Sequence, residues 1–176
     1  MIEGLFNARR STRDYSQKQI PDEVLTEICR LATLAPSAIN AQPWKLYAVT
    51  GDRAKEFIPL VQTGGANGWA NGATAFVVIQ SLPPHAIMRG ERRVTNEPFI
   101  PNDIGILTAY LTLAAENKGV QSCIIGLRDE DGIADFLNLP KGTPFPLVVA
   151  LGYASEDCPV TPKRRRDFDK VFSLIK

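Results

Sequence analysis

Two clusters of basic residues, one near each end of the 176-residue chain, carry the side chains best suited to bind an anion. The first cluster contains Arg9, Arg10 and Arg13, with Ser11 between them. An arginine guanidinium presents a planar fork of donors that fits the oxygens of a phosphate group. Taken alone, this cluster is better explained as a solvated surface that caps the negative end of a preceding helix.

The second cluster, Lys163, Arg164, Arg165 and Arg166, follows an apolar stretch and a proline-containing turn. Such a basic tail is also typical of nonspecific contact with nucleic acid or anionic lipid. The formal net charge of the chain is only +1, however, and two aspartates follow the cluster closely. Proteins that bind nucleic acid or anionic membranes along their surface usually carry a large excess of basic residues, and this chain does not. We therefore expect neither a nucleic acid nor a membrane as partner.

A polar segment between two prolines, residues 35–44, joins an expected helix to an expected strand. It holds Ser37, Asn40 and Gln42, which present hydroxyl and amide edges. Such groups suit hydrogen bonding to a heteroaromatic ring system, and the prolines restrict the backbone so that the segment is pre-organised. The alternative is an ordinary helix-to-strand loop that places Trp44 in the core.

The residues that usually carry acid–base, nucleophilic or metal chemistry are sparse. The chain has one histidine, His85, in a segment where such a residue usually faces solvent. No motif of a serine hydrolase, zinc protease or P-loop is present, and the glycines at 64–72 do not match a dinucleotide-binding fingerprint. Cys29, Cys123 and Cys158 lack metal-ligand spacing, and we expect reduced thiols in a cytoplasmic protein. Anion-binding clusters without a catalytic set indicate that a bound cofactor carries the reaction.

Hydrophobic periodicity predicts the helices and strands that position these segments. Helices are expected over residues 2–8, from 20–23 to just before residue 36, and over 53–61, 103–118 and 130–137. Strands are expected over residues 44–50, 73–80, 122–125 and 147–153. Residues 64–68 are expected to form a flexible loop. Residues 82–100, which contain several prolines and charges, are expected to be irregular and mobile.

The order of these elements favours an α+β layer fold, because helices and strands do not alternate strictly. No linker divides the chain, so we expect a single domain over residues 1–176. The helix at 103–118 is apolar almost all round, which is typical of a core or a subunit interface. No apolar stretch approaches the ~20 residues of a membrane span, and no signal peptide is visible, so a cytoplasmic location is expected.

Three segments, taken in order, resemble the nitroreductase family of FMN enzymes. They are residues 9–13, residues 35–44, and the stretch from Gly152 through the second basic cluster. The most specific element is the pattern Pro-Ser-x-x-Asn-x-Gln-Pro-Trp at 36–44. The long helix and following strand at 102–126 also fit the family. The resemblance covers nearly the whole chain.

The resemblance implies a nitroreductase-like α+β fold with a central, mostly antiparallel sheet flanked by helices. It also implies an intertwined homodimer with two FMN sites at its interface. By resemblance, the phosphate and ribityl chain would be held by Arg9, Arg10, Ser11, Arg13, Lys163 and Arg165. The isoalloxazine ring would be lined from the partner subunit by Pro36, Ser37, Ala38 and Asn40. Backbone contacts near the reactive edge of the ring would come from Ile125 and Gly126.

The chain departs from the family pattern at a few positions, which bear on the substrate class more than on FMN binding. Ala38 stands where relatives often have a second small hydroxyl residue, and Ile125 where an acidic residue is often found. Asn67 and Asn71 are both candidates for a further contact to FMN.

The reaction implied by the resemblance is hydride transfer from NADH or NADPH to bound FMN, then to a nitroaromatic, quinone or similar small-molecule acceptor, with ping-pong kinetics. No catalytic side chain and no metal would be required. Two alternatives keep the fold: an FMN-dependent reductive dehalogenase and a non-catalytic flavin-binding sensor. A nucleic-acid-binding module is the alternative from another class, and it would show strongly salt-dependent affinity.

Overall fold

A four-stranded antiparallel sheet forms the centre of the computed structural model, which describes residues 2–89 and 91–176. The strands lie in the order β1-β2-β6-β5. Their bounds are Trp44–Thr50 for β1, Ala75–Ser81 for β2, Gln121–Ile125 for β5 and Leu147–Gly152 for β6. Every pair in this sheet is antiparallel. The prediction of an α+β fold around a mostly antiparallel sheet is therefore confirmed.

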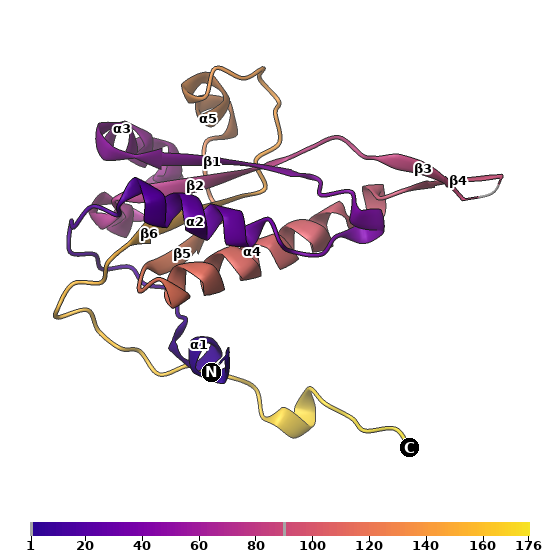
Figure 1. The fold of residues 1–176 in the computed structure, drawn as a ribbon. Coiled ribbons are helices and arrows are strands. Elements are labelled where there is room, and N and C mark those ends of the chain that lie inside the picture. Colours follow the sequence, from indigo (N-terminus) through magenta and orange to yellow (C-terminus); the bar gives the residue numbers. More distant parts are fainter. Residues whose placement is uncertain (1, 90) are drawn as a thin grey trace.

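Both faces of the sheet are covered by helices, which explains the continuous apolar run of β2. Val77 and Ile79 pack on one face with α2 (Asp22–Ala32) and α4 (Ile100–Asn117). Phe76 and Val78 pack on the other face with α3 (Gly51–Val61) and α5 (Glu130–Phe136). Successive side chains of a strand point to opposite faces, so an apolar residue at every position buries both. Figure 1 shows the two helix pairs on opposite sides of the sheet.

The long helix α4 begins at Ile100, three residues earlier than the periodicity predicts. Pro101 is accommodated in its first turn, where the missing amide hydrogen leaves no helical hydrogen bond unmade. The helix ends before Gly119, whose φ of 70° suits a glycine after a helix end. Ile106 and Tyr110 remain exposed on one side of it. An exposed apolar side on a core helix is consistent with a subunit interface.

Most other predicted elements are present, with shifted ends. The first helix, α1, covers Ile2–Ala8 as expected. The predicted loop at 64–68 is divided between two short 3-10 helices, η2 (Thr63–Gly65) and η3 (Gly68–Gly72). None of the helices formed by residues 2–89 and 91–176 is long and apolar enough to cross a bilayer.

The prediction that residues 82–100 are irregular is wrong. They form a β-hairpin of β3 (Ala86–Arg89) and β4 (Arg92–Thr95), followed by the 3-10 helix η4 (Glu97–Phe99). The prolines flank the two strands and do not interrupt them. Four-residue strands are too short and too charged to show an alternating pattern. Figure 1 shows this hairpin extending away from the sheet, beyond the N-terminal end of α4.

The C-terminal tail after β6 carries little regular structure apart from η5 (Phe168–Lys170). It runs close to α1 and then away from the sheet (Figure 1). Several of its large apolar side chains, such as Phe168 and Leu174, are exposed, each at 67%. Phe6 of α1 is 55% exposed. The apolar surface of one chain is therefore concentrated on α1, one side of α4 and the tail.

Candidate functional site

The first basic cluster lies on an extended segment, residues 9–15, that leaves α1 and runs along the edge of the sheet. Ser11 forms a parallel bridge with Ser122 of β5, and Tyr15 forms an antiparallel bridge with Ala154, just past β6. These two contacts fix the segment at both ends. They hold the arginines of residues 9–13 at the edge of the sheet.

Tyr15 anchors this segment to the core. Its side chain is 6% exposed, and its hydroxyl donates to the carbonyl oxygen of Thr12 at 2.7 Å. Burial raises the pKa of Tyr15 well above its usual value, so the hydroxyl stays a neutral donor. The ring also fills the space over Gly152, where an added Cβ would lie 2.6 Å from the ring atom Cδ1. The backbone of the cluster is therefore rigidly held.

The second basic cluster returns to the first through Lys163. The Nζ atom of Lys163 donates to the carbonyl oxygens of Phe6 at 2.6 Å and Asn7 at 2.7 Å, in the last turn of α1. A cation at this position stabilises the negative end of a helix. The sequence suggested that the first basic cluster caps this helix, but Lys163 of the second cluster does so. This contact brings the two clusters together.

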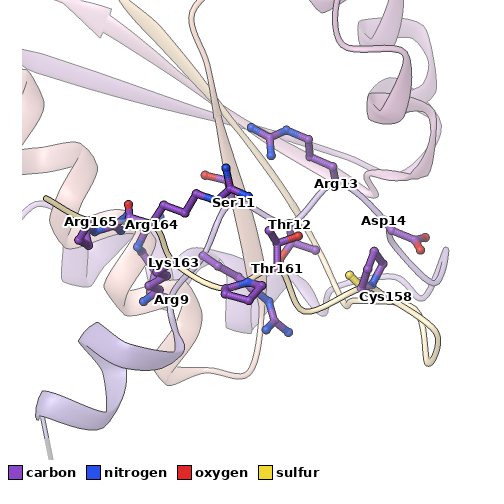
Figure 2. Close-up of a pocket in the computed structure, with 13 residues that line it drawn as sticks. Arg9, Ser11, Thr12, Arg13, Asp14, Cys158, Thr161, Lys163, Arg164 and Arg165 are labelled. Atoms are coloured by element: carbon purple, nitrogen blue, oxygen red, sulfur yellow. The ribbon is translucent and has the colours of Figure 1, made fainter.

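One cavity of about 550 Å³ is shared by the two clusters, as Figure 2 shows. Its cationic lining comes from both ends of the chain: Arg9, Arg10, Arg13, Lys163, Arg164 and Arg165. Ser11 and Thr12 also line it, and the hydroxyl Oγ1 of Thr12 is buried without a hydrogen-bond partner. Arg166 is not part of the lining. All the cations predicted as phosphate ligands therefore meet in one place.

The electrostatics of the cavity favour an anion. Asp14 is the acidic residue among those that line it. None of the six lining cations joins a salt bridge within the described part of the chain. Desolvation, together with repulsion from Arg9 and Arg165, lowers the pKa of Lys163. Six cations crowded around one carboxylate create a positive potential that a phosphate would relieve.

The predicted ring-binding segment lies elsewhere in the same chain. Pro36, Ser37, Ala38 and Asn40 sit beside the start of α4, and none of them lines the basic cavity. The segment contains the short 3-10 helix η1 (Ala38–Asn40) and leads into Trp44, which is buried as the loop interpretation predicts. One copy of the chain therefore does not join this segment to its own basic cavity.

The same segment is held in an unusual backbone conformation. Ile39, Asn40 and Gln42 all have positive φ, between 47° and 56°. Such non-glycine residues cost roughly 1–3 kcal/mol each and persist only where surrounding contacts hold them. Here the amide of Gln42 donates to Ser37 Oγ at 2.9 Å. Strain of this kind is concentrated at functional sites, which supports a binding role for the segment.

Asp103 also holds this segment, although no motif in the sequence points to it. Its Oδ1 accepts from the amide of Ala38 at 3.0 Å, while its Oδ2 is buried without a partner. The side chain is only 3% exposed. The available signal was a carboxylate among apolar residues at the start of a buried helix.

Ile125 is the last residue of β5, the strand whose Ser122 forms a bridge with Ser11, and Gly126 follows it. The side chain of Ile125 is 1% exposed and packs in the core, so that residue offers a ligand only its backbone. Gly126 is exposed, with open space where a Cβ would stand. Because Ser11 and Ser122 pair in parallel, the direction from Arg9 to Arg13 is also the direction toward Gly126.

Asn67 and Asn71 make internal contacts. The Nδ2 atom of Asn67 donates to the carbonyl oxygen of Val61 at 2.9 Å. The Oδ1 atom of Asn71 accepts from Gln62 at 2.9 Å. Both side chains thus order the loop around η2 and η3.

The cysteines and the potential metal ligands are dispersed. Cys29, Cys123 and Cys158 are free thiols, and burial raises the pKa of Cys29 to about 11. Burial also raises the pKa of Cys123. Among residues 2–89 and 91–176, no three His, Cys, Asp or Glu side chains are grouped so that they could hold a metal ion.

Comparison with known proteins identifies relatives along most of the chain. The model of the nitroreductase family matches residues 7–63 and 51–153. An NADH dehydrogenase of Thermus thermophilus is 28% identical over 85% of this chain and 84% of its own length. An iodotyrosine dehalogenase 1 homolog of Caenorhabditis elegans is 26% identical over 94% of this chain, and the match covers only 58% of the length of that protein. A crystal structure of an oxidoreductase containing FMN has a TM-score of 0.73 and 27% identity, covering 86% of this chain and 76% of its own.

Proposed function

Because the chain belongs to the nitroreductase family of oxidoreductases, we propose that two copies of it bind FMN at their interface. The bound FMN would serve electron transfer from NADH or NADPH to a nitroaromatic, quinone or similar small acceptor. One observation carries this proposal: six cations from the two ends of the chain meet around one cavity.

The cavity fits the phosphate end of FMN. A phosphate monoester carries a charge of about −1.5 to −2 at neutral pH. Arg9, Arg10, Lys163 and Arg165 would bind its oxygens, with Ser11 and Arg13 toward the ribityl chain. Each hydrogen bond to such a charged group contributes roughly 1.5–3 kcal/mol. The unpartnered hydroxyl of Thr12 lines the same cavity and is a further polar group without a hydrogen bond.

The direction of β5 supports an orientation for the rest of the cofactor. The strand rises about 3.3 Å per residue, so Gly126 lies about 13 Å beyond Ser122. A ligand with its phosphate in the basic cavity would extend past Arg13 and bring its ring to the backbone of Ile125 and Gly126. Because the side chain of Ile125 is in the core, only main-chain groups would meet the ring edge there.

The partner subunit would complete the ring site with Pro36, Ser37, Ala38 and Asn40. In one chain these residues lie outside the basic cavity, so a second copy supplies what the first lacks. Exposed apolar side chains such as Phe6 and Tyr110 give two copies a surface to bury. The dimer is therefore part of the proposed function.

FMN, when bound, supplies the hydride chemistry. The side chains of this protein would bind and orient the cofactor and leave one face of its ring open to both substrates in turn, which gives ping-pong kinetics. Water would be the proton source, and a backbone amide near Gly126 would donate a hydrogen bond to the edge of the ring. No side chain is assigned as an essential acid or base.

A titration of the protein with FMN tests this proposal. Arg9→Ala is expected to raise the dissociation constant about 10- to 100-fold, because it removes one charge-assisted contact. Arg53→Ala, an exposed arginine on α3 that pairs with Glu56, is the matched control and is expected to bind FMN normally. Equal affinities for the wild type and both variants would contradict the proposed site.

Reductive dehalogenation is the second candidate reaction for the same site, since one relative is named an iodotyrosine dehalogenase 1 homolog. A screen of the reduced protein with nitroaromatic, quinone and halogenated phenolic acceptors separates the two reactions. A flavin-binding sensor would retain FMN but oxidise NADH and NADPH negligibly with every acceptor.

A further inference from the structure

The hairpin β3–β4 arises from the same corner of the molecule as the ring-binding segment. The amide of Leu82, four residues before β3, donates to the carbonyl oxygen of Pro43 at 3.0 Å. After β4, the chain passes through η4 into α4, whose Asp103 holds the amide of Ala38. The two ends of the hairpin therefore flank the segment that we assign to the flavin ring.

The base of the hairpin is fixed by Asn96, which is completely buried. Its side-chain Oδ1 accepts from the backbone amide of His85 at 2.6 Å. Its backbone amide donates to the carbonyl oxygen of His85 at 3.2 Å. The amide of Phe99 then donates to the carbonyl oxygen of Asn96 at 2.9 Å. With these bonds in place, the fold sets the direction of the hairpin relative to the ring-binding segment.

The outer part of the hairpin is basic and exposed. Arg92 and Arg93 are both solvent-exposed, and neither joins a salt bridge in the described ranges. They are adjacent in β4 and therefore point to opposite faces. Arg92 shares its face with Val94, and Arg93 lies opposite Met88, which is 65% exposed. Each face thus combines a guanidinium with an apolar side chain.

The hairpin has features of a surface that is covered in the working molecule. An isolated two-stranded hairpin is marginally stable in water. Arg93 lies three residues beyond Asn96, so it is carried about 10 Å out from the base. A structure that extends so far and exposes Met88 gains stability when it packs over a second copy or a bound ligand.

We propose that this hairpin reaches over the FMN site of the partner subunit, where Arg92 and Arg93 bind the anionic group of the substrate. This inference rests on the proposed function. The basic cavity is the site proposed for the cofactor phosphate, so we assign the two arginines of the hairpin to a different anion. That anion is a phosphate of the nicotinamide donor or a carboxylate of the acceptor. The neighbouring apolar side chains contact the ring system of the same molecule.

The double substitution Arg92→Gln, Arg93→Gln tests this assignment, with the two single variants as companions and Arg53→Gln as matched control. The FMN-loaded dimer is titrated with 4-nitrobenzoate and with its neutral methyl ester, and binding is followed by the change in flavin absorbance. The rate of flavin reduction is measured against NADH concentration. Thermal melting and FMN affinity report the fold and the cofactor site.

The double variant is expected to lose about tenfold in affinity for 4-nitrobenzoate, for NADH, or for both, through the lost charge-assisted bonds. The methyl ester and FMN are expected to bind within about twofold of wild type. An effect on NADH alone identifies the donor phosphates as the anion, and an effect on 4-nitrobenzoate alone identifies an acceptor carboxylate.

An equal loss of affinity for 4-nitrobenzoate and for its methyl ester would overturn the proposal. The arginines would then affect binding without contacting the anionic group. No loss for either anion, with normal FMN binding, would overturn it while leaving the proposed function intact. Salt-dependent DNA binding lost in the variant would assign the arginines to a nucleic acid and also overturn it. A wild type that binds no FMN would remove the proposed function, and this inference with it.

Discussion

At the scale of single residues, the basic cavity distinguishes two neighbouring cations of the tail. Lys163 lines the cavity and bonds to the last turn of α1, whereas Arg166 lies outside the lining. Lys163→Gln is expected to raise the dissociation constant for FMN about tenfold, and Arg166→Gln to leave it within about twofold. Fluorescence titration measures both values. Equal losses in the two variants would indicate a diffuse effect of charge instead of a defined phosphate site.

The pH dependence of FMN affinity follows from the same lysine. Desolvation, with help from Arg9 and Arg165, lowers the pKa of Lys163. Lys163 attracts phosphate only while protonated, so the affinity of the wild type should decrease as pH rises through this lowered pKa. Lys163→Gln lacks the group and should show a weaker alkaline decrease. Both proteins should lose affinity below about pH 6, where the phosphate dianion takes up a proton and becomes a monoanion.

Single residues also show how much of the candidate site could be predicted from the sequence. The arginines of residues 9–13, together with Lys163 and Arg165, were predicted as one anion site because their order resembled a family. Asp103 was missed because its partner is a backbone amide 65 residues away, and sequence spacing does not reveal such a contact.

At the scale of elements, the extended segment 9–15 depends on a close approach between Tyr15 and β6. Gly152→Ala would place a methyl group 2.6 Å from the Tyr15 ring. The ring is buried and its hydroxyl is bonded to Thr12, so it yields poorly. We expect a loss of about 1–3 kcal/mol in stability, a fall in Tm of about 2–10 °C, and weaker FMN binding.

Gly4→Ala in α1 is the control for this change, because no atom lies within 4 Å of its added Cβ. Thermal unfolding of the two variants compares them directly. A Gly152→Ala protein as stable as the wild type would show that Tyr15 is not held as the structure indicates.

The ring-binding segment gives a second prediction at this scale. Asp103→Ala removes the acceptor for the partly buried Ala38 amide and leaves it unsatisfied, which costs about 1 kcal/mol. Asp103→Asn keeps an oxygen at the same position and should restore much of the loss. The measurement is thermal stability together with the visible spectrum of bound FMN, which senses the ring environment. Equal behaviour of the two variants would exclude a role for this hydrogen bond.

Elements were predicted best where they are long and apolar. The strands β2 and β6 and the helix α4 repeat apolar residues over enough positions to reveal their type. The hairpin β3–β4 was missed because its strands have four residues each and are stabilised by pairing with each other. The start of α4 was predicted three residues late, and Pro101 lies in the first turn that the prediction left out.

At the scale of the whole molecule, the proposed FMN site depends on a dimer. An apolar groove of about 470 Å³ between α1, α2 and α4 is lined by residues that include Phe6, Leu34 and Tyr110. Tyr110→Glu places a charge in this groove and is expected to give a monomer that binds FMN weakly, since residues 36–40 of the partner are then missing. Lys55→Glu on α3, across the sheet from α4, is the control. Light scattering and FMN titration report the two effects, and a wild-type monomer that binds FMN tightly would contradict the dimer.

The family and its fold could be recognised from the sequence because three separated motifs occur in a characteristic order. The complete site could not be derived in the same way. The segments proposed to bind the ring and the phosphate lie in different places on one chain, and the proposed dimer would unite them.

The visible spectrum of the FMN-reconstituted protein, before and after NADH or NADPH is added without oxygen, tests the central claim most directly. We expect a flavin absorbance that remains with the protein during gel filtration, bleaches with the donor, and returns when a nitroaromatic or quinone is added. A protein that retains no flavin, or whose bound flavin stays oxidised with both donors, would contradict it.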